Sequence, residues 1–257
     1  MAALWLIGGT SESRDLVNFL LPYGISLVIT VTTPTAARLY PQHSQIQVRV
    51  GPLDAANLLP FVRDDNICGI IDASHPYATV ISQGAIALSQ AHNLPYLRYE
   101  RQDLETRGAI AVPDWATLLT GEMLSDRRVL FIVGYRPLAQ LAPWQERGTF
   151  FARILPSAIA LNAALAAGFT PDRLIALRPP ITPPLELALW QQWSIDTVVC
   201  KASGTPGGQE VKEQVAQALG VRLLILQRPE IAYPQQTRNP EDILKFCTVC
   251  LVGAKRQ

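Results

Sequence analysis

Near its start the chain places two glycines and two hydroxyl side chains between a strand-like and a helix-like segment: Gly8, Gly9, Thr10 and Ser11. Glycines let a backbone approach a phosphate closely, and a helix N-terminus attracts negative charge through its dipole and its N–H groups. A structural turn with a hydroxyl helix cap is the simpler alternative, because the third glycine of a G-x-G-x-x-G motif is missing. We predict that nucleotide phosphates bind at this turn.

The end of the second predicted strand carries hydroxyls and a guanidinium where an acid is usual: Thr33, Thr35 and Arg38. A typical NAD site has an Asp or Glu near this position, which holds the ribose 2′-hydroxyl. An arginine among hydroxyls suits a 2′-phosphate better. The pattern therefore favours NADPH as the cofactor, with NADH as the alternative, and a polar loop with a solvated arginine is the competing structural interpretation.

A histidine motif, D-A-S-H-P-Y-A at residues 72–78, follows a predicted buried strand. Ligand groups in open α/β sheets project from the carboxyl ends of the strands. The candidates here are Ser74, His75 and Tyr77, of which His75 can donate a proton or bond a carboxylate. A histidine that only caps the next helix is the alternative.

A second glycine-rich loop, K-A-S-G-T-P-G-G at residues 201–208, also joins a predicted strand to a predicted helix. Its glycines, hydroxyls and lysine are typical of an anion-binding loop. We predict that Lys201, Ser203 and Gly204 contact cofactor or substrate anions. The alternative is a flexible turn with a surface lysine.

Arginines recur near the predicted strand ends. Each alone is most often a surface charge, but together they can line a cleft for a ligand with several carboxylates. The set is Arg98, Arg101, Arg136, Arg153, Arg178 and Arg228.

The elements that position these residues alternate between short β-branched runs and helical patterns, which predicts parallel sheets. The predicted strands are 4–8, 26–32, 46–50, 69–73, 95–99, 128–133, 149–154, 173–177, 197–200 and 222–226. The predicted helices are 11–21, 55–64, 79–92, 157–167, 184–193, 209–219 and 240–252.

The predicted fold class is α/β, with two Rossmann-like domains whose mainly parallel sheets flank an active-site cleft. Residues 1–100 form the predicted nucleotide-binding domain, 101–127 a connecting segment and 128–257 the second domain. His75 and the pair Lys201 and Ser203 are then expected to face each other across the groove between the domains.

Composition narrows the classes of partner. The net charge of +1 gives no electrostatic case for nucleic acid or an anionic membrane. The apolar start is short and leads into a Gly-Gly turn, so a strand is expected there and not a signal peptide. The four cysteines, including the C-x-x-C at 247–250, lack the pattern of a metal site. We expect a cytoplasmic protein without a metal, either a monomer or a small homo-oligomer.

Taken in order, these motifs resemble those of the precorrin-6A and cobalt-precorrin-6A reductase family. Residues 8–14 (G-G-T-S-E-S-R) are similar to its G-G-T-x-E-A-R, and residues 72–78 to its D-A-T-H-P-F-A. Residues 201–208 are similar to its K-x-S-G-x-x-G-G. The matches run from Leu6 to Pro229, whereas residues 134–138 and 178–181 depart from the family pattern.

The resemblance implies an oxidoreductase of cobalamin biosynthesis that transfers a hydride from NADPH or NADH to a macrocycle double bond. The cofactor then carries the chemistry and the protein positions it. The candidate proton donors are His75, Tyr77 and Lys201, with bound water as a fourth. The implied contacts to the corrin precursor are Ser74, His75, Arg101, Arg136, Arg153 and Lys201.

Two other functions are weighed against this one. A short-chain dehydrogenase needs Tyr-x-x-x-Lys, and no tyrosine of the chain is followed by lysine at that spacing. A two-lobed module that binds a nucleotide or tetrapyrrole without turnover is the non-enzymatic alternative. The sequence leaves open whether the substrate carries cobalt.

Overall fold

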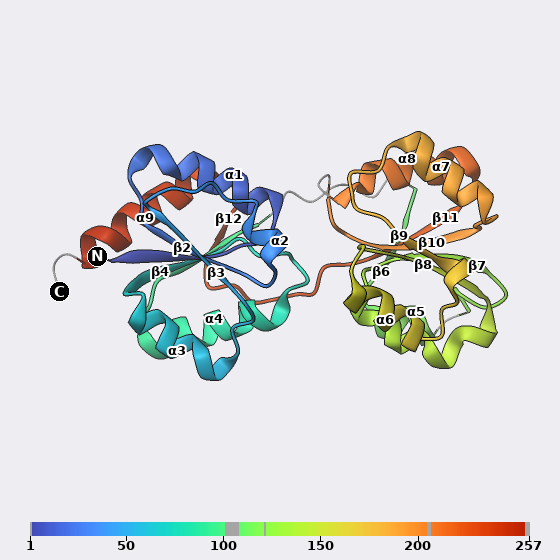
Figure 1. Cartoon of the computed structure of the whole chain (residues 1–257), viewed down its shortest axis with the longest axis horizontal. Coiled ribbons are helices and arrows are strands. Elements are labelled where there is room, and N and C mark those ends of the chain that lie inside the picture. The colour runs from blue at the N-terminus through green and yellow to red at the C-terminus, as the bar shows by residue number, and fades with distance from the viewer. Residues whose placement is uncertain (1, 101–107, 121, 205–206, 255–257) are drawn as a thin grey trace. The chain divides into compact units, whose positions relative to one another are not determined.

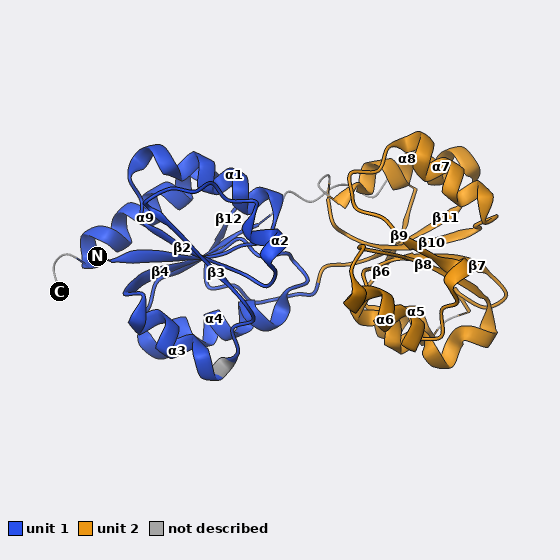
Figure 2. Cartoon of the chain, viewed as in Figure 1, with its two compact units in different colours: residues 1–102, 229–257 blue, residues 103–228 orange. Residues whose placement is uncertain are grey.

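A computed structural model describes residues 2–100, 108–120, 122–204 and 207–254. The chain divides into two compact units, coloured separately in Figure 2. Unit 1 comprises residues 1–102 and 229–257, and unit 2 comprises residues 103–228.

Unit 1 is a parallel six-stranded sheet in the order β12-β5-β4-β1-β2-β3. Helices α1 and α9 cover one face of the sheet, and α3 and α4 cover the other (Figure 1). The strands are β1 (Ala3–Ile7), β2 (Leu27–Val31), β3 (Ile46–Val50), β4 (Ile67–Asp72), β5 (Tyr96–Tyr99) and β12 (Gln236–Thr237). The helices are α1 (Ser11–Leu20), the 3-10 turn η1 (Leu21–Tyr23), α2 (Pro34–Ala37), α3 (Ala55–Asp64), α4 (Thr79–His92) and α9 (Pro240–Ala254).

The central strands of unit 1 are almost wholly apolar because both faces of the sheet are covered. Every residue of β1 and β2 is buried. One core lies under α1 and α9 and contains Leu16 and Ile243, and a second lies under α3 and α4 and contains Leu58 and Ile86. Continuous β-branched runs that read as strands in the sequence are therefore the middle of the sheet.

Unit 2 repeats this architecture with the strand order β6-β11-β10-β7-β8-β9, again all parallel. Its two cores pack under α5 with α6 and under α7 with α8. The strands are β6 (Ile110–Val112), β7 (Arg128–Ile132), β8 (Thr149–Ile154), β9 (Leu174–Ala176), β10 (Thr197–Lys201) and β11 (Arg222–Leu226). The helices are α5 (Trp115–Thr120), η2 (Arg136–Arg147), α6 (Ala158–Ala166), η3 (Pro171–Arg173), α7 (Pro183–Gln192) and α8 (Gln209–Leu219).

The strand order of each sheet reverses once, between β1 and β4 in unit 1 and between β7 and β10 in unit 2. Ligands of open α/β sheets bind beyond the carboxyl ends of the strands at such a reversal. The loops after these four strands are therefore where each unit is expected to present ligand groups.

The two units exchange their sixth strands. Strand β6 follows β5 in the chain but pairs with β11 of unit 2, and β12 follows β11 but pairs with β5 of unit 1. The predicted α/β class with parallel sheets is confirmed. The predicted domain limits need two corrections: residues 229–257 belong to unit 1, because α9 packs on β1, β4 and β5, and the presumed connecting segment contains β6 and α5 of unit 2.

Candidate functional site

The turn after β1 in unit 1 is closed by internal hydrogen bonds. The N–H of Gly8 donates to the Thr30 carbonyl at 3.0 Å, and the N–H of Gly9 donates to the Tyr40 hydroxyl at 2.7 Å. The N–H of Thr10 donates to Ser13 Oγ at 3.0 Å. The three backbone donors predicted to hold phosphate are thus already paired within the protein.

Thr10 is the N-cap of α1. Its Oγ1 accepts from the N–H of Ser13 at 3.0 Å and donates to the Ala73 carbonyl at 3.1 Å. The hydroxyl therefore joins the start of α1 to the end of β4 across the strand-order reversal. The Thr10 side chain therefore acts as a helix cap. Ser11, the first residue of α1, is only partly buried.

The two glycines of the turn are required for different reasons. A Cβ on Gly8 would lie 2.2 Å from the Tyr40 hydroxyl oxygen, so a side chain there displaces the tyrosine. Gly9 has a φ of +99°, which disfavours any residue with a side chain. Neither reason involves a ligand.

Helix α2 and its two caps contain the three residues predicted to recognise a 2′-phosphate. Thr33, Thr35 and Arg38 are all exposed, and Thr33 Oγ1 also caps α2 by accepting from the N–H of Ala36 at 3.2 Å. Arg38 is the C-cap of α2. The guanidinium is on the surface of unit 1, on the loop that follows β2.

A buried ion pair lies at the carboxyl ends of β4 and β5. Arg98 Nη1 donates to Asp72 Oδ1 at 2.8 Å, and the two side chains are 1% and 0% exposed. Arg98 Nε donates to Glu100 at 3.0 Å, and the guanidinium lies over the ring of Tyr233, 5.1 Å from its centroid. Tyr96 donates to the other Asp72 oxygen at 2.7 Å, and burial followed by the charge of Asp72 raises the pKa of that phenol.

This ion pair holds the backbone and side chain of Ser74. The Ser74 N–H donates to Asp72 Oδ1 at 3.0 Å, and Ser74 Oγ accepts from Arg98 Nη1 at 3.1 Å. Ser74 is 4% exposed and its hydroxyl also lies 3.3 Å from that of Ser82. The hydroxyl already has protein partners, and its contact with substrate stays a prediction.

His75 and Tyr77 lie further along the same turn. Both are partly buried, and their rings lie 5.7 Å apart between centroids. The Tyr77 N–H donates to His75 Nδ1 at 3.3 Å, which places the imidazole proton on Nε2 when the ring is neutral. The turn thus presents an imidazole and a phenol beyond the carboxyl end of β4.

Lys201 and Arg136 lie at the carboxyl ends of the two strands that flank the reversal in unit 2. Lys201 is the last residue of β10, and Arg136 begins η2 after β7. Burial and, second, the charge of Arg136 lower the pKa of Lys201. Two cationic side chains thus lie at the carboxyl ends of neighbouring strands, the position expected for a ligand.

A buried lysine that the sequence analysis did not single out donates hydrogen bonds to the glycine-rich loop after β10. Lys212 is 2% exposed, and its Nζ donates to the carbonyls of Gly207 and Gly208 at 2.6 and 3.0 Å. Burial lowers the pKa of Lys212. A Cβ on Gly207 would lie 1.9 Å from Ser203 Oγ, so the serine side chain fills the inside of this loop.

The remaining predicted arginines differ in position. Arg153 is 8% exposed and its Nη1 donates to Glu186, which also accepts from Trp190 at 2.9 Å. Its charge is therefore neutralised inside unit 2, which does not favour the predicted contact with substrate. Arg101 lies outside the described residues.

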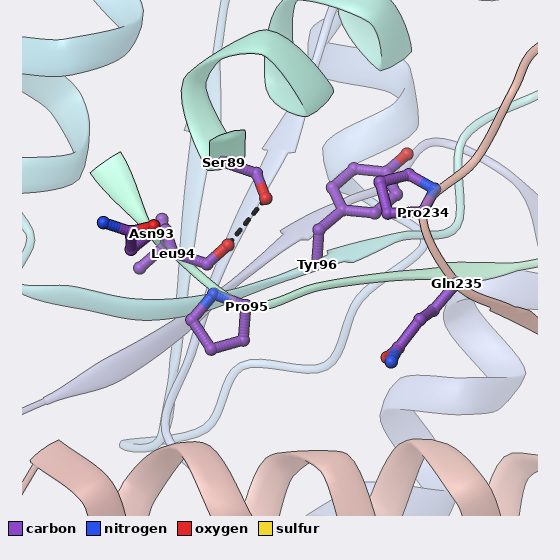
Figure 3. A pocket seen from close by; sticks show the side chains of 7 residues that line it. All are labelled: Ser89, Asn93, Leu94, Pro95, Tyr96, Pro234 and Gln235. Carbon is purple, nitrogen blue, oxygen red and sulfur yellow. Dashed lines mark hydrogen bonds between the residues drawn. The ribbon is translucent and has the colours of Figure 1, made fainter. Parts of the chain in front are cut away.

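A separate pocket of about 420 Å³ lies at the amino end of β5, away from the strand ends described above (Figure 3). Ser89 Oγ donates to the Leu94 carbonyl at 2.6 Å on its wall. Its lining residues are Ser89, Asn93, Leu94, Pro95, Tyr96, Pro234 and Gln235.

Within the described ranges, no three His, Cys, Asp or Glu side chains are grouped so that they can hold a metal ion. The cysteines at 68, 200, 247 and 250 are all free thiols. Among the described helices, none is both long and apolar enough to cross a membrane.

Comparisons with known proteins agree with this architecture. Residues 3–248 match the family model described as precorrin-6x reductase CbiJ/CobK. The chain is 45% identical over 251 residues to a cobalt-precorrin-6A reductase of Synechocystis, covering 96% of both chains. A cobalt-precorrin-6A reductase of Priestia megaterium is 27% identical, covering 89% of this chain and 91% of the other. A solved structure titled CobK precorrin-6A reductase superposes with a TM-score of 0.77 at 22% identity, covering 97% and 98% of the two chains.

Proposed function

Because this chain belongs to the precorrin-6x reductase family, CbiJ/CobK, we propose that it reduces one double bond of precorrin-6A or of its cobalt form. A hydride passes from a reduced nicotinamide to one carbon of the macrocycle, a proton is added to the neighbouring carbon, and the cofactor leaves oxidised. The observation that carries the proposal is the 45% identity to a cobalt-precorrin-6A reductase over nearly the whole of both chains.

We propose NADPH as the cofactor and unit 1 as its site. Support comes from the strand order of unit 1, which is that of dinucleotide-binding sheets, and from α2, which presents Arg38 and two threonines where an NAD site has an acid. Since the N–H groups of Gly8, Gly9 and Thr10 are used internally, the phosphates are expected to approach at Ser11, in the first turn of α1.

For the macrocycle we propose contacts from the strand ends of both units. Its carboxylates suit Lys201, which ends β10, and Arg136, which begins η2 after the neighbouring strand β7. His75 and Tyr77 are the proposed residues for orienting the ring or adding the proton. That the loops of His75 and Lys201 face each other remains a prediction.

The test is turnover with defined substrates. Precorrin-6A and cobalt-precorrin-6A are each mixed with the protein and NADPH, and the fall of nicotinamide absorbance is compared with the mass of the product. A gain of two hydrogens with matching NADPH oxidation is expected for at least one substrate. Binding of NADPH without oxidation in either mixture would support the non-enzymatic alternative and contradict the proposal.

A further inference from the structure

The Tyr40 hydroxyl lies between the two segments of unit 1 to which the cofactor is assigned. Tyr40 follows α2 and is 7% exposed. It packs in the core cluster that contains Ile29 and Val31 of β2. The hydroxyl lies 2.7 Å from the amide nitrogen of Gly9 and 2.7 Å from Ser13 Oγ. A side chain attached to the α2 loop thus reaches into the turn at the start of α1.

The direction of these hydrogen bonds follows from proton counting. Ser13 Oγ donates its only proton to the Thr10 carbonyl at 2.7 Å, so it accepts from Tyr40. The Tyr40 oxygen in turn accepts from the N–H of Gly9. Burial raises the pKa of Tyr40, so the phenol keeps the proton that this arrangement requires.

Packing joins the same two segments. The Tyr40 hydroxyl fills the space in which a Cβ of Gly8 would lie, and the Ala36 side chain of α2 lies 4.0 Å from the Cβ position of Gly9. Backbone hydrogen bonds connect Tyr40 to α2, because its N–H donates to the Ala37 carbonyl at 3.3 Å. Arg38 is therefore two residues from a side chain anchored in the turn.

We propose that Tyr40 is a positioning residue for cofactor discrimination: by fixing α2 against the turn, it holds Arg38 where a 2′-phosphate can be bound. This inference rests on the proposed NADPH site. A charge-assisted contact to phosphate depends on the placement of the guanidinium. NADH lacks the 2′-phosphate, so its affinity does not depend on where Arg38 is held.

The perturbation is Tyr40→Phe, which keeps the ring in the core and removes both hydrogen bonds. We expect the dissociation constant for NADPH to rise about tenfold, equivalent to about 1.4 kcal/mol. The dissociation constant for NADH is expected to change by less than about twofold, equivalent to about 0.4 kcal/mol, because NADH has no 2′-phosphate for Arg38 to bind. If Tyr40 had only a structural role, Tyr40→Phe would weaken the binding of both cofactors by the same factor or leave both unchanged.

The experiment titrates NADPH and NADH separately into the full chain and follows nicotinamide fluorescence, with no tetrapyrrole present. Tyr23→Phe is the matched control, because Tyr23 is a 56% exposed tyrosine of the same unit. Arg38→Ala tests the underlying site. The readout is the ratio of the dissociation constant for NADH to that for NADPH. If Arg38→Ala leaves this ratio unchanged, the proposed NADPH site is wrong, whatever Tyr40→Phe does.

If Arg38→Ala lowers the ratio and a folded Tyr40→Phe does not, the site stands and the inference about Tyr40 is overturned. Should Tyr40→Phe not fold, Ser13→Ala takes its place, because it removes the acceptor of the Tyr40 proton and keeps the tyrosine itself. It also removes the two hydrogen bonds between Ser13 Oγ and the Thr10 backbone, so the comparison of NADPH with NADH, and not the loss of affinity alone, is the readout. Ser13→Ala is then expected to lower the ratio in the same direction, and an unchanged ratio overturns the inference.

Discussion

Replacing Arg98 by methionine tests whether the buried ion pair supports the turn at His75. Asp72 and Arg98 are 0% and 1% exposed, and removing one partner of such a pair typically costs about 3–5 kcal/mol. In the variant, Asp72 keeps its hydrogen bonds from Tyr96 and from the Ser74 N–H. These two donors place the expected loss at the lower end of that range, about 3 kcal/mol.

Asp72→Asn should cost less than Arg98→Met, because Arg98 keeps Glu100 as a second partner at 3.0 Å. The double variant should be more stable than the sum of the single losses predicts, by a coupling of about 1–3 kcal/mol.

Urea unfolding followed by circular dichroism gives the free energies, and hydrogen exchange of peptides from β4 and β5 shows whether the loss lies in unit 1. Single losses below about 1 kcal/mol, or strict additivity in the double variant, would refute the assignment of a coupled buried pair.

Three further predictions concern the strand ends. Gly8→Ala should lower stability by about 1–3 kcal/mol, because its Cβ overlaps the Tyr40 hydroxyl; an unchanged melting temperature would contradict the contact. The KM for the tetrapyrrole should rise as the pH increases through the pKa of Lys201, which burial and Arg136 hold below its usual value, because only the charged ammonium binds carboxylates. Lys201→Arg should keep KM flat over that range, and matching pH profiles for the two proteins would reject this role. His75→Ala should raise KM for the macrocycle more than it lowers kcat if the imidazole orients the ring, whereas a kcat loss of about 10²–10⁴ would identify it as the proton donor; wild-type kinetics would exclude both.

The sequence was sufficient for the class of fold because the signals of the sheets are local. The run Ile67–Asp72 is apolar up to its last residue, and such a run is typical of a strand covered on both faces. The limits of the units were missed because the exchange of β6 and β12 leaves no local trace. A two-residue strand such as β12 exists only through its pairing with β5.

The site residues show the same division. Glycines and hydroxyls at a strand–helix junction identified the turn, but the sequence could not separate a helix cap from a ligand contact at Thr10, since both use the same side-chain types. Tyr40 was missed because its partners are 31 and 27 residues away in the chain. Asp72 and Arg98 did carry a signal, since opposite charges occur at or next to the ends of two neighbouring strands.

The exchanged strands also set the order in which the protein can fold as it is synthesised. A nascent chain released from the ribosome up to residue 228 contains the whole of unit 2, whereas unit 1 still lacks β12 and α9. Until α9 emerges, only α1 covers the face of the sheet that these two helices share, and the part that packs against Ile243, Cys247 and Cys250 lacks its helix. Unit 1 is the first to be synthesised in part and the last to be completed, so its incomplete form is the species expected to need a chaperone. Because unit 1 is made of two separate segments of the chain, no single division of the chain yields both units intact.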